Sequence, residues 1–304
     1  MPLALWPCAQ SSETEQRSRR YLPSRDLVSE LMPPELAHRI LLAYSSAGDL
    51  VVDPRCGSGT VLIEAAVLGR IATGLDSRAA AVQAARANRN FGLPPEARSA
   101  VEILVGAAPR LSEVVPDLLG AVDLIVLTPP ALADVAAAPP TINAQGHPEP
   151  PAPQCKAEAE AEVTAEAEVP DCAADAAARA WCDWSSATFA GCWQLLRPGG
   201  LLVTVTCNTP QGGQLIDLAG HSVAVAQHVG FGYLQHVIAL LGPVTGGAIH
   251  PPGYLSVAPD GTHDRSACRP VHADVCVFTK PAAGLPATGR SHVRPGGAEA
   301  AHAA

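Results

Sequence analysis

Residues 51–76, VVDPRCGSGTVLIEAAVLGRIATGLD, contain the pattern that decides the fold. The apolar run over residues 48–54 is typical of a short buried strand, and it ends at a proline, which has no N–H to donate to a sheet. A loop with two glycines leads into an apolar helix over residues 60–69, and a second strand covers residues 71–76. Two strands joined by a helix indicate a parallel sheet, because the crossover between parallel strands has to pass over one face.

The rest of the chain continues the alternation of strand and helix. The pattern predicts helices over residues 77–92, 177–198 and 215–229, a short helical stretch over 108–119, and strands over 101–106, 122–127, 201–207, 233–241 and 273–280. With the first two strands this makes seven. We therefore predict an α/β fold of the Rossmann-like type, a mostly parallel seven-stranded sheet with helices on both faces.

The chain of 304 residues is expected to form one domain over residues 24–281, between an N-terminal tail (1–23) and a disordered tail (282–304). A segment over about residues 131–176 is rich in Pro, Ala and Glu and is expected to be a disordered insertion. It carries nine acidic residues and one basic residue, so the rest of the chain accounts for only −1 of the net charge of −9. That near-neutral remainder neither favours nor excludes a polyanionic partner.

Cysteine and histidine spacing argues against metal centres and disulfides. The nine cysteines are scattered without a Cys-x-x-Cys pair, and the ten histidines show no ligand spacing. No apolar run approaches the roughly 18 residues of a membrane helix, and the first twenty residues do not fit a secretory signal. We expect no metal, no membrane partner and a cytoplasmic protein.

The glycine loop DPRCGSGT, residues 53–60, has three possible ligands. A phosphate-binding P-loop needs a lysine where this chain has Thr60, and a dinucleotide fingerprint needs a third glycine near Leu62. The third possible ligand is S-adenosyl-L-methionine, whose methyltransferases have a loop of this kind. In that reading Asp76, at the end of the second strand, accepts hydrogen bonds from both ribose hydroxyls. The candidate cofactor-binding residues are Asp53, Pro54, Cys56, Gly57, Gly59, Thr60 and Asp76, with packing the more natural role for the Cys56 side chain.

These motifs resemble the amino-methyltransferase superfamily that includes N4-cytosine/N6-adenine DNA methylases and tRNA guanine-N2 methyltransferases. Residues 51–76 resemble its cofactor-binding region, and LMPPELAHRILLAY, residues 31–44, resembles the helix that precedes the loop and helps hold the methionine end of the cofactor. Residues 195–206, 212–231 and 272–281 look like the distal part of actinobacterial DNA methylase-like proteins. The resemblance implies a class I methyltransferase fold and S-adenosyl-L-methionine as cofactor.

The fourth strand ends in Thr128-Pro129-Pro130-Ala131, where the resembled family has (Asp/Asn/Ser)-Pro-Pro-aromatic. An exocyclic amine on a base is a poor nucleophile, because its lone pair is delocalised into the ring. Acceptors for its N–H groups, here the Thr128 hydroxyl and the Pro129 carbonyl, return electron density to the nitrogen and aim it at the methyl group. Thr128, Pro129 and Pro130 are therefore the candidate catalytic residues, and no cysteine nucleophile is required.

Three departures from the family pattern bear on activity. Thr128 keeps an acceptor hydroxyl but lacks the stronger carboxylate of many adenine enzymes. Ala131 replaces the aromatic residue that stacks on a flipped base, a contact worth about 1–3 kcal/mol. Trp181 or Trp184 could substitute, although their helical spacing favours core packing. After the third strand, Gly106-Ala107-Ala108 replaces an Asp that related enzymes often place near the cofactor adenine.

The sequence therefore predicts an S-adenosyl-L-methionine-dependent N-methyltransferase acting on a base amine of nucleic acid. DNA, at cytosine N4 or adenine N6, is favoured over RNA. Two alternatives stay open: a tRNA or rRNA guanine-N2 methyltransferase, and a degenerate homologue that binds cofactor without transferring methyl. Methylation of a small molecule or protein amine would use the same loop.

Overall fold

The computed structural model of this protein describes residues 4–18, 20–23, 32–136, 176–211, 214–249 and 271–282. Most of the predicted insertion, from residue 137 to 175, and the predicted tail from residue 283 lie outside the described residues. The first part of the predicted insertion is ordered: α7 (Leu132–Ala136) follows directly after the fourth predicted strand.

Eight strands form one sheet in the order β1-β9-β12-β6-β5-β2-β3-β4. They are β1 (Leu5–Pro7), β2 (Leu50–Asp53), β3 (Ile71–Asp76), β4 (Val101–Val105), β5 (Val122–Leu127), β6 (Leu196–Thr206), β9 (Gly232–Leu240) and β12 (His272–Thr279). Only β12 runs antiparallel to its neighbours, β6 and β9. The mostly parallel sheet is thus confirmed with all seven predicted strands, and β1 is an eighth.

The strand order places two loop-bearing strands side by side. From β2 the chain moves outward through β3 to β4, and then returns to the other side of β2 to form β5. In open parallel sheets, ligands bind at the carboxyl ends of strands at this reversal point. The glycine loop after β2 and the Thr-Pro-Pro loop after β5 therefore lie at the same edge of the sheet. The order and the inserted antiparallel β12 are those of the class I methyltransferase fold.

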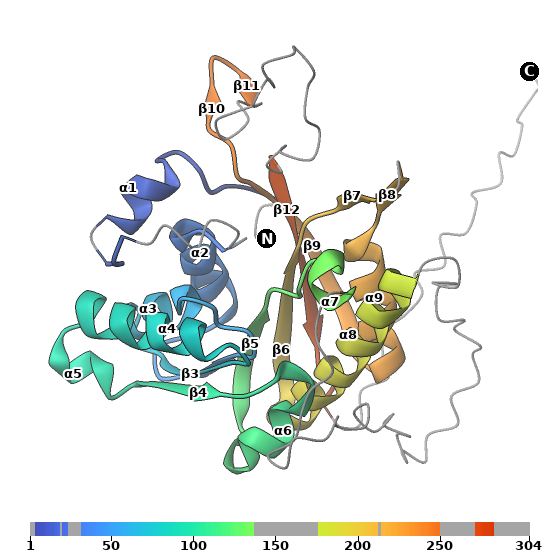
Figure 1. Cartoon of the computed structure of the whole chain (residues 1–304), viewed down its shortest axis with the longest axis horizontal. Coiled ribbons are helices and arrows are strands. Elements are labelled where there is room, and N and C mark those ends of the chain that lie inside the picture. The colour runs from blue at the N-terminus through green and yellow to red at the C-terminus, as the bar shows by residue number, and fades with distance from the viewer. Residues whose placement is uncertain are drawn as a thin grey trace, which may run out of the picture.

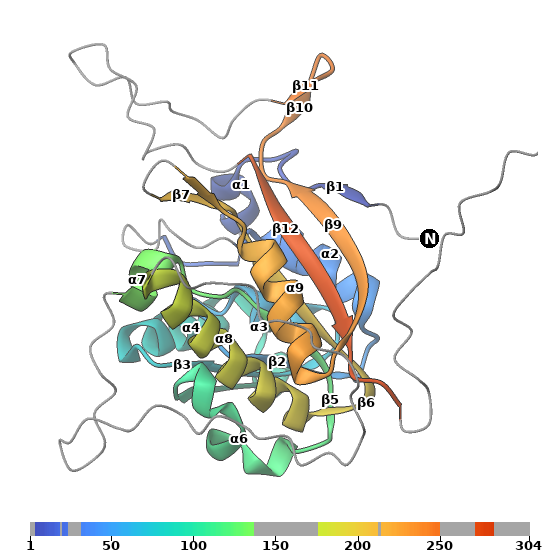
Figure 2. The ribbon, with the colours of Figure 1, turned by 90° about the vertical axis from the view of Figure 1, so that its right-hand side faces the viewer.

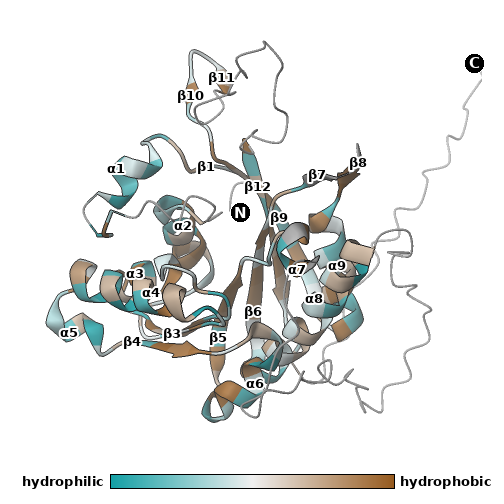
Figure 3. Ribbon diagram, in the orientation of Figure 1, coloured by the Kyte–Doolittle hydropathy of each residue, from teal (hydrophilic) through white to brown (hydrophobic). Residues whose placement is uncertain are grey.

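Helices cover both faces of the twisted sheet (Figures 1 and 2). One face carries α2 (Pro34–Tyr44), α3 (Thr60–Val67) and α4 (Ala79–Gly92). The other carries α6 (Leu111–Val114), α8 (Ala176–Leu195) and α9 (Leu218–Val229). Among the described residues, one large apolar core lies under each set of helices, and a third, smaller cluster joins α7, α8 and the start of α9. Figure 3 shows the same division, with apolar residues along the central strands and polar residues on the outer helices.

Short elements complete the described structure. They are α1 (Glu13–Arg17), α5 (Pro95–Arg98), the 3-10 helices η1 (Ala108–Arg110) and η2 (Pro116–Leu118), and the two-stranded pairs β7 (Thr209–Gln211) with β8 (Gln214–Ile216) and β10 (Val244–Thr245) with β11 (Ala248–Ile249). No helix among the described residues is long and apolar enough to cross a membrane.

The N-terminal segment is not the tail that the sequence predicted. Strand β1 pairs in parallel with β9, with Leu5 opposite Ile238, and α1 packs near α2. A three-residue edge strand has too few positions to show an alternating pattern, and it becomes a strand only because β9 offers unpaired backbone groups. Residues 4–18 and 20–23 therefore belong to the domain.

The helix predicted over 215–229 begins later, at Leu218. Residues 214–216 instead pair with β7 as an antiparallel hairpin. The Asp217 side chain then accepts a hydrogen bond from the Gly220 backbone N–H, which makes Asp217 the N-cap. A capping aspartate marks a helix start more reliably than the apolar residues before it.

Candidate functional site

The loop after β2 presents backbone donors at the N-terminus of α3. Gly57 and Gly59 have φ angles of 52° and 86°, in the left-handed region that other residues rarely adopt. Buried Asp53 accepts a hydrogen bond from the Arg55 N–H at 3.0 Å, which fixes the entrance to the loop. The helix starts at Thr60, so the unpaired N–H groups of its first turn follow the glycines directly. Such a terminus favours polar or anionic groups of a ligand.

Close packing beneath the loop holds it in place. A Cβ on Gly59 would lie 3.1 Å from the Cβ of Ala85 in α4, so a side chain fits here only if the loop or this helix shifts. The Cys56 N–H donates to the Leu75 carbonyl at 2.8 Å, and its side chain packs against Gly74. Cys56 is thus a buried packing residue in the floor of the loop. The six described cysteines are all buried.

Asp76 lies at the end of β3 with only 1% of its surface exposed. Its Oδ2 accepts hydrogen bonds from the Gly57 N–H at 3.1 Å and from Arg78 Nη2 at 3.0 Å. Its Oδ1 accepts from the Arg78 backbone N–H at 2.9 Å and from Arg78 Nε at 3.0 Å. Burial raises the pKa of the Asp76 carboxyl, but the hydrogen bonds from Arg78 and Gly57 outweigh it and hold the pKa below its usual value. Asp76 is therefore an ionised acceptor beside the glycine loop.

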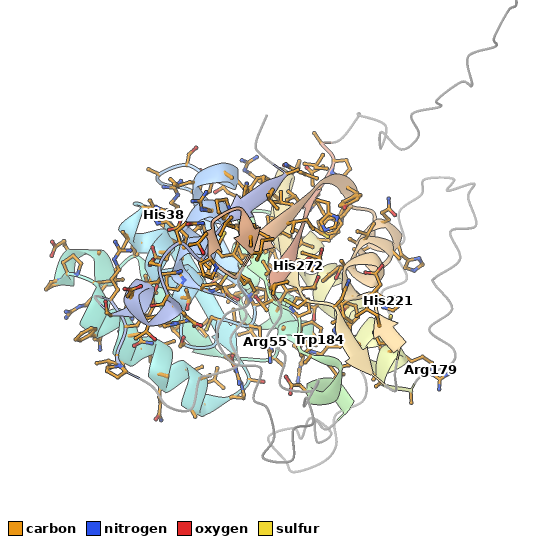
Figure 4. The ribbon with its side chains drawn as sticks, turned by 90° about the horizontal axis from the view of Figure 1, so that it is seen from above. His38, Arg55, Arg179, Trp184, His221 and His272 are labelled. Carbon is orange, nitrogen blue, oxygen red and sulfur yellow. The ribbon has the colours of Figure 1, made fainter. Side chains whose placement is uncertain are left out.

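Arg55 lies between the two loops, near the centre of the view from above (Figure 4). Its guanidinium is 3.8 Å from a carboxylate oxygen of Asp134 in α7, and Asp53, Asp76 and Arg78 also act on it electrostatically. Burial lowers the pKa of this guanidinium, and the positive charge of Arg78 lowers it further. The side chain connects the glycine loop with the segment that follows the Thr-Pro-Pro loop.

The segment after β4 is small and apolar, as its sequence indicates. A Cβ on Gly106 would lie 3.0 Å from side-chain atoms of Leu75 and Val114, so this position fits no larger residue without a shift. Ala108 is buried, and Ala107 is half-buried. A ligand at this edge meets backbone groups and methyl groups here, not a carboxylate.

The Thr-Pro-Pro loop is held from below by α8. Pro129 and Pro130 are buried and Thr128 is half-buried, while Ala131 is exposed. The indole N–H of Trp181 donates to the Pro130 carbonyl at 2.9 Å. Because Trp181 is fully buried, it cannot stack on a base, so the interpretation of this residue as a core residue is confirmed. Pro130 uses its carbonyl to anchor the loop, which leaves the Pro129 carbonyl as the candidate acceptor.

Trp181→Phe is expected to loosen this loop. Phenylalanine fills most of the indole volume but has no N–H, and the buried Pro130 carbonyl loses its donor at a cost of about 1–3 kcal/mol. Urea unfolding measures this loss. Trp184→Phe, at a half-buried position on the same helix, is the matched control and should change stability by less than about 1 kcal/mol. Equal effects of the two variants would contradict the anchoring role.

A buried carboxylate on α3, Glu64, joins the N-terminal segment to the glycine loop. It accepts hydrogen bonds from Arg20 at 2.9 and 3.1 Å, from the Tyr21 hydroxyl at 2.9 Å and from His38 Nδ1 at 3.1 Å. Arg17 reaches the Thr60 hydroxyl at 3.4 Å and lies over the Tyr21 ring. Burial raises the pKa of the Tyr21 phenol, and the charge of Glu64 raises it further. A lone acidic residue within an apolar helix was the available signal for this cluster.

The structure thus brings most sequence-predicted site residues to one edge. Asp53, Gly57, Gly59 and Thr60 belong to one loop, which the hydrogen bond from the Gly57 N–H to Asp76 joins to the end of β3. The strand order brings the Thr-Pro-Pro loop beside it. Among the described residues, no group of three or more His, Cys, Asp or Glu side chains could hold a metal ion. The site can hold a polar ligand against β2 and β3 and present acceptor oxygens from the end of β5.

Residues 2–87 match the model of a family described as N6/N4 DNA methylase. The chain matches none of the curated proteins with which it was compared. Among solved structures it is similar to TrmN from Thermus thermophilus (17% identity over 84% of this chain and 51% of that one, TM-score 0.46). It is also similar to a TehB-like SAM-dependent methyltransferase from Corynebacterium glutamicum (16% identity over 80% of this chain and 86% of that one, TM-score 0.42). The chain therefore spans about half the length of the TrmN chain.

The family match covers the N-terminal segment, α2, the glycine loop, β3 and the first half of α4. The resemblance to DNA methylases is confirmed for these residues. The match also begins at residue 2, which agrees with the finding that β1 and α1 are parts of the domain. It supports S-adenosyl-L-methionine as the ligand of the loop.

Proposed function

We propose that this protein is an S-adenosyl-L-methionine-dependent N-methyltransferase that acts on an exocyclic amine of a nucleic-acid base. One observation carries the proposal: a glycine loop with a buried carboxylate partner and a Thr-Pro-Pro loop follow adjacent strands on either side of the reversal point. Such an arrangement brings a methyl donor and an amine acceptor into one crevice.

The residues at this edge fit the proposed cofactor. The N-terminus of α3 and the glycine backbone bind its methionine end, Asp76 binds the ribose, and the small residues after β4 pack on the adenine. When bound, the cofactor supplies an electrophilic methyl group on a sulfonium.

The Thr-Pro-Pro loop then orients the accepting amine. The Thr128 hydroxyl and the Pro129 carbonyl accept hydrogen bonds from its two N–H groups and direct the nitrogen lone pair to the methyl group. Two consecutive prolines keep the carbonyl fixed, because their φ angles are locked and they offer no N–H to a strand. Trp181 holds the neighbouring carbonyl, that of Pro130, from the core and so anchors the loop.

DNA is the favoured substrate, at cytosine N4 or adenine N6, because the family match is to DNA methylases. Guanine N2 of tRNA or rRNA is the runner-up, since it presents the same kind of amine to the same loop. Near-neutral charge outside residues 131–176 gives no strong attraction to phosphates, so binding of either nucleic acid is expected to be modest.

A specific observation favours a second candidate, a homologue that binds cofactor without transferring methyl. Ala131 is exposed at the position of the stacking aromatic residue. Losing about 1–3 kcal/mol of stacking weakens base capture by about one to two orders of magnitude. An Ala131→Tyr variant that gains activity where the parent has none would favour this second candidate.

Thr128→Ala is expected to lower the rate of methyl transfer by about 10- to 100-fold, because one acceptor of the amine is lost. Its affinity for S-adenosylhomocysteine, measured by calorimetry, should change by less than about twofold. Thr279→Ala is the control: Thr279 ends the antiparallel strand β12 and therefore lies at the opposite edge of the sheet.

Transfer of labelled methyl to DNA and to tRNA, followed by nucleoside analysis, tests the proposal. N4-methylcytosine or N6-methyladenine supports the DNA assignment, and N2-methylguanosine supports the runner-up. If S-adenosylhomocysteine binds but neither nucleic acid is methylated, the proposed activity is wrong and the non-catalytic candidate takes its place.

A further inference from the structure

The carboxylate proposed to bind the ribose is already fully engaged by this chain. Four N–H donors reach Asp76: the backbone N–H groups of Gly57 and Arg78, and Nε and Nη2 of the Arg78 guanidinium. A carboxylate offers about four lone-pair positions. Two ribose hydroxyls therefore find no free acceptor position on Asp76 while the Arg78 side chain stays in place.

We propose that Arg78 is an internal competitor for the cofactor, and that its guanidinium must leave Asp76 before the ribose hydroxyls can bind. The inference rests on the proposed function, because it concerns the same cofactor site. It makes Arg78 a residue that sets cofactor affinity without contacting the reacting atoms.

Of these four donors, only the Arg78 guanidinium belongs to a mobile side chain and not to the backbone. The Gly57 N–H belongs to the buried glycine loop, and the Arg78 N–H belongs to the N-cap of α4, so both backbone donors are fixed by the fold. The Arg78 side chain, by contrast, is 56% exposed, whereas that of Asp76 is 1% exposed. Solvent therefore reaches the guanidinium where it contacts Asp76, and the two N–H groups that it withdraws are replaced by two ribose O–H groups.

The surrounding charges favour this exchange. Arg55 is close enough to Arg78 that the two positive charges repel each other. After the exchange, Asp76 keeps its two backbone donors and gains two neutral ones, so the buried carboxylate is never left without hydrogen bonds. The exchange still replaces charged donors with neutral ones, and this difference lowers the affinity for the cofactor.

Calorimetric titration with S-adenosylhomocysteine tests the inference. Arg78→Leu removes the competitor and is expected to bind about 3- to 10-fold more tightly than the parent. Arg86→Leu removes the same charge from an exposed position of α4, where the guanidinium bonds to the Ile103 carbonyl, and should leave the affinity within about twofold. Arg78→Lys keeps the charge but cannot make the bidentate contact, so its affinity for S-adenosylhomocysteine should lie between those of the parent and Arg78→Leu.

Salt provides a second readout on the same proteins. Screening weakens the exposed side of the Arg78–Asp76 pair, while S-adenosylhomocysteine carries no net charge. The affinity of the parent should therefore rise between about 0.05 M and about 0.5 M salt, and that of Arg78→Leu should stay flat.

The possible results distinguish a failure of this inference from a failure of the proposed function. If the parent binds and Arg78→Leu binds equally or more weakly, Arg78 is not a competitor and the inference is overturned. If none of the four proteins binds S-adenosylhomocysteine at any salt concentration, the proposed cofactor is wrong, and this inference is wrong with it.

Discussion

Gly59→Val is expected to abolish cofactor binding, lowering the affinity for S-adenosylhomocysteine by about 100-fold or more. Valine at a φ of 86° is strained, and its first side-chain atom would lie 3.1 Å from the Cβ of Ala85 and 3.4 Å from the Ala85 Cα. Backbone cannot yield as a flexible side chain does, so the loop itself has to move. That movement carries the Gly57 N–H away from Asp76 and displaces the first turn of α3. Calorimetric titration measures the loss.

Gly48→Val is the control that distinguishes the effect of backbone strain from the effect of a distorted cofactor loop. Gly48 has a φ of 88°, nearly that of Gly59, but nothing lies within 4 Å of its added Cβ, and it precedes β2 at the edge opposite the loop. Both variants pay for the unfavourable φ, at about 1–2 kcal/mol. Only Gly59→Val should lose the ligand. A comparable loss of affinity in Gly48→Val would attribute the effect to general instability instead.

Gly59 also shows why the fold and the cofactor loop were predictable from sequence. Local patterns decide both: apolar runs of strand length, an apolar helix, and glycines where the backbone has to turn. All seven predicted strands occur in the sheet, and the predicted loop lies at the carboxyl end of β2. Such features depend on neighbours within a few residues, which is the range that a sequence pattern can report.

Contacts between distant residues were not predictable in the same way. Trp181 and Pro130 are 51 positions apart, yet one hydrogen bond between them anchors the proposed catalytic loop. Strand β1 pairs with β9, which lies at the other end of the chain, with Leu5 opposite Ile238. The ion pair between Asp76 and Arg78 was also not predictable from sequence, although the two residues are close in the chain. Their pairing depends on how the chain turns from β3 into α4.

Glu64 carries the largest set of such long-range contacts, and Glu64→Leu is expected to cost about 3 kcal/mol of unfolding free energy. Removing Glu64 takes away the shared acceptor of Arg20, Tyr21 and His38, and the Tyr21 hydroxyl keeps the longer contact to the Thr60 carbonyl at 3.5 Å. Tyr21 is buried and cannot turn to water, whereas the Arg20 side chain is 40% exposed and can, which keeps the cost at the lower end of the range for buried pairs. Thermal unfolding should fall by roughly 6–12 °C.

Glu113→Leu is the matched control, because Glu113 pairs with Arg110 on the surface at 52% exposure and such pairs contribute about 0–1 kcal/mol. A double-mutant cycle then isolates the pair. If Arg20 and Glu64 act together, Arg20→Leu should cost less in the Glu64→Leu background than in the parent, by about 1 kcal/mol. Additive effects would contradict the coupling. Because the same segment brings Arg17 to Thr60 at the start of α3, Glu64→Leu should also weaken the binding of S-adenosylhomocysteine, and Glu113→Leu should not.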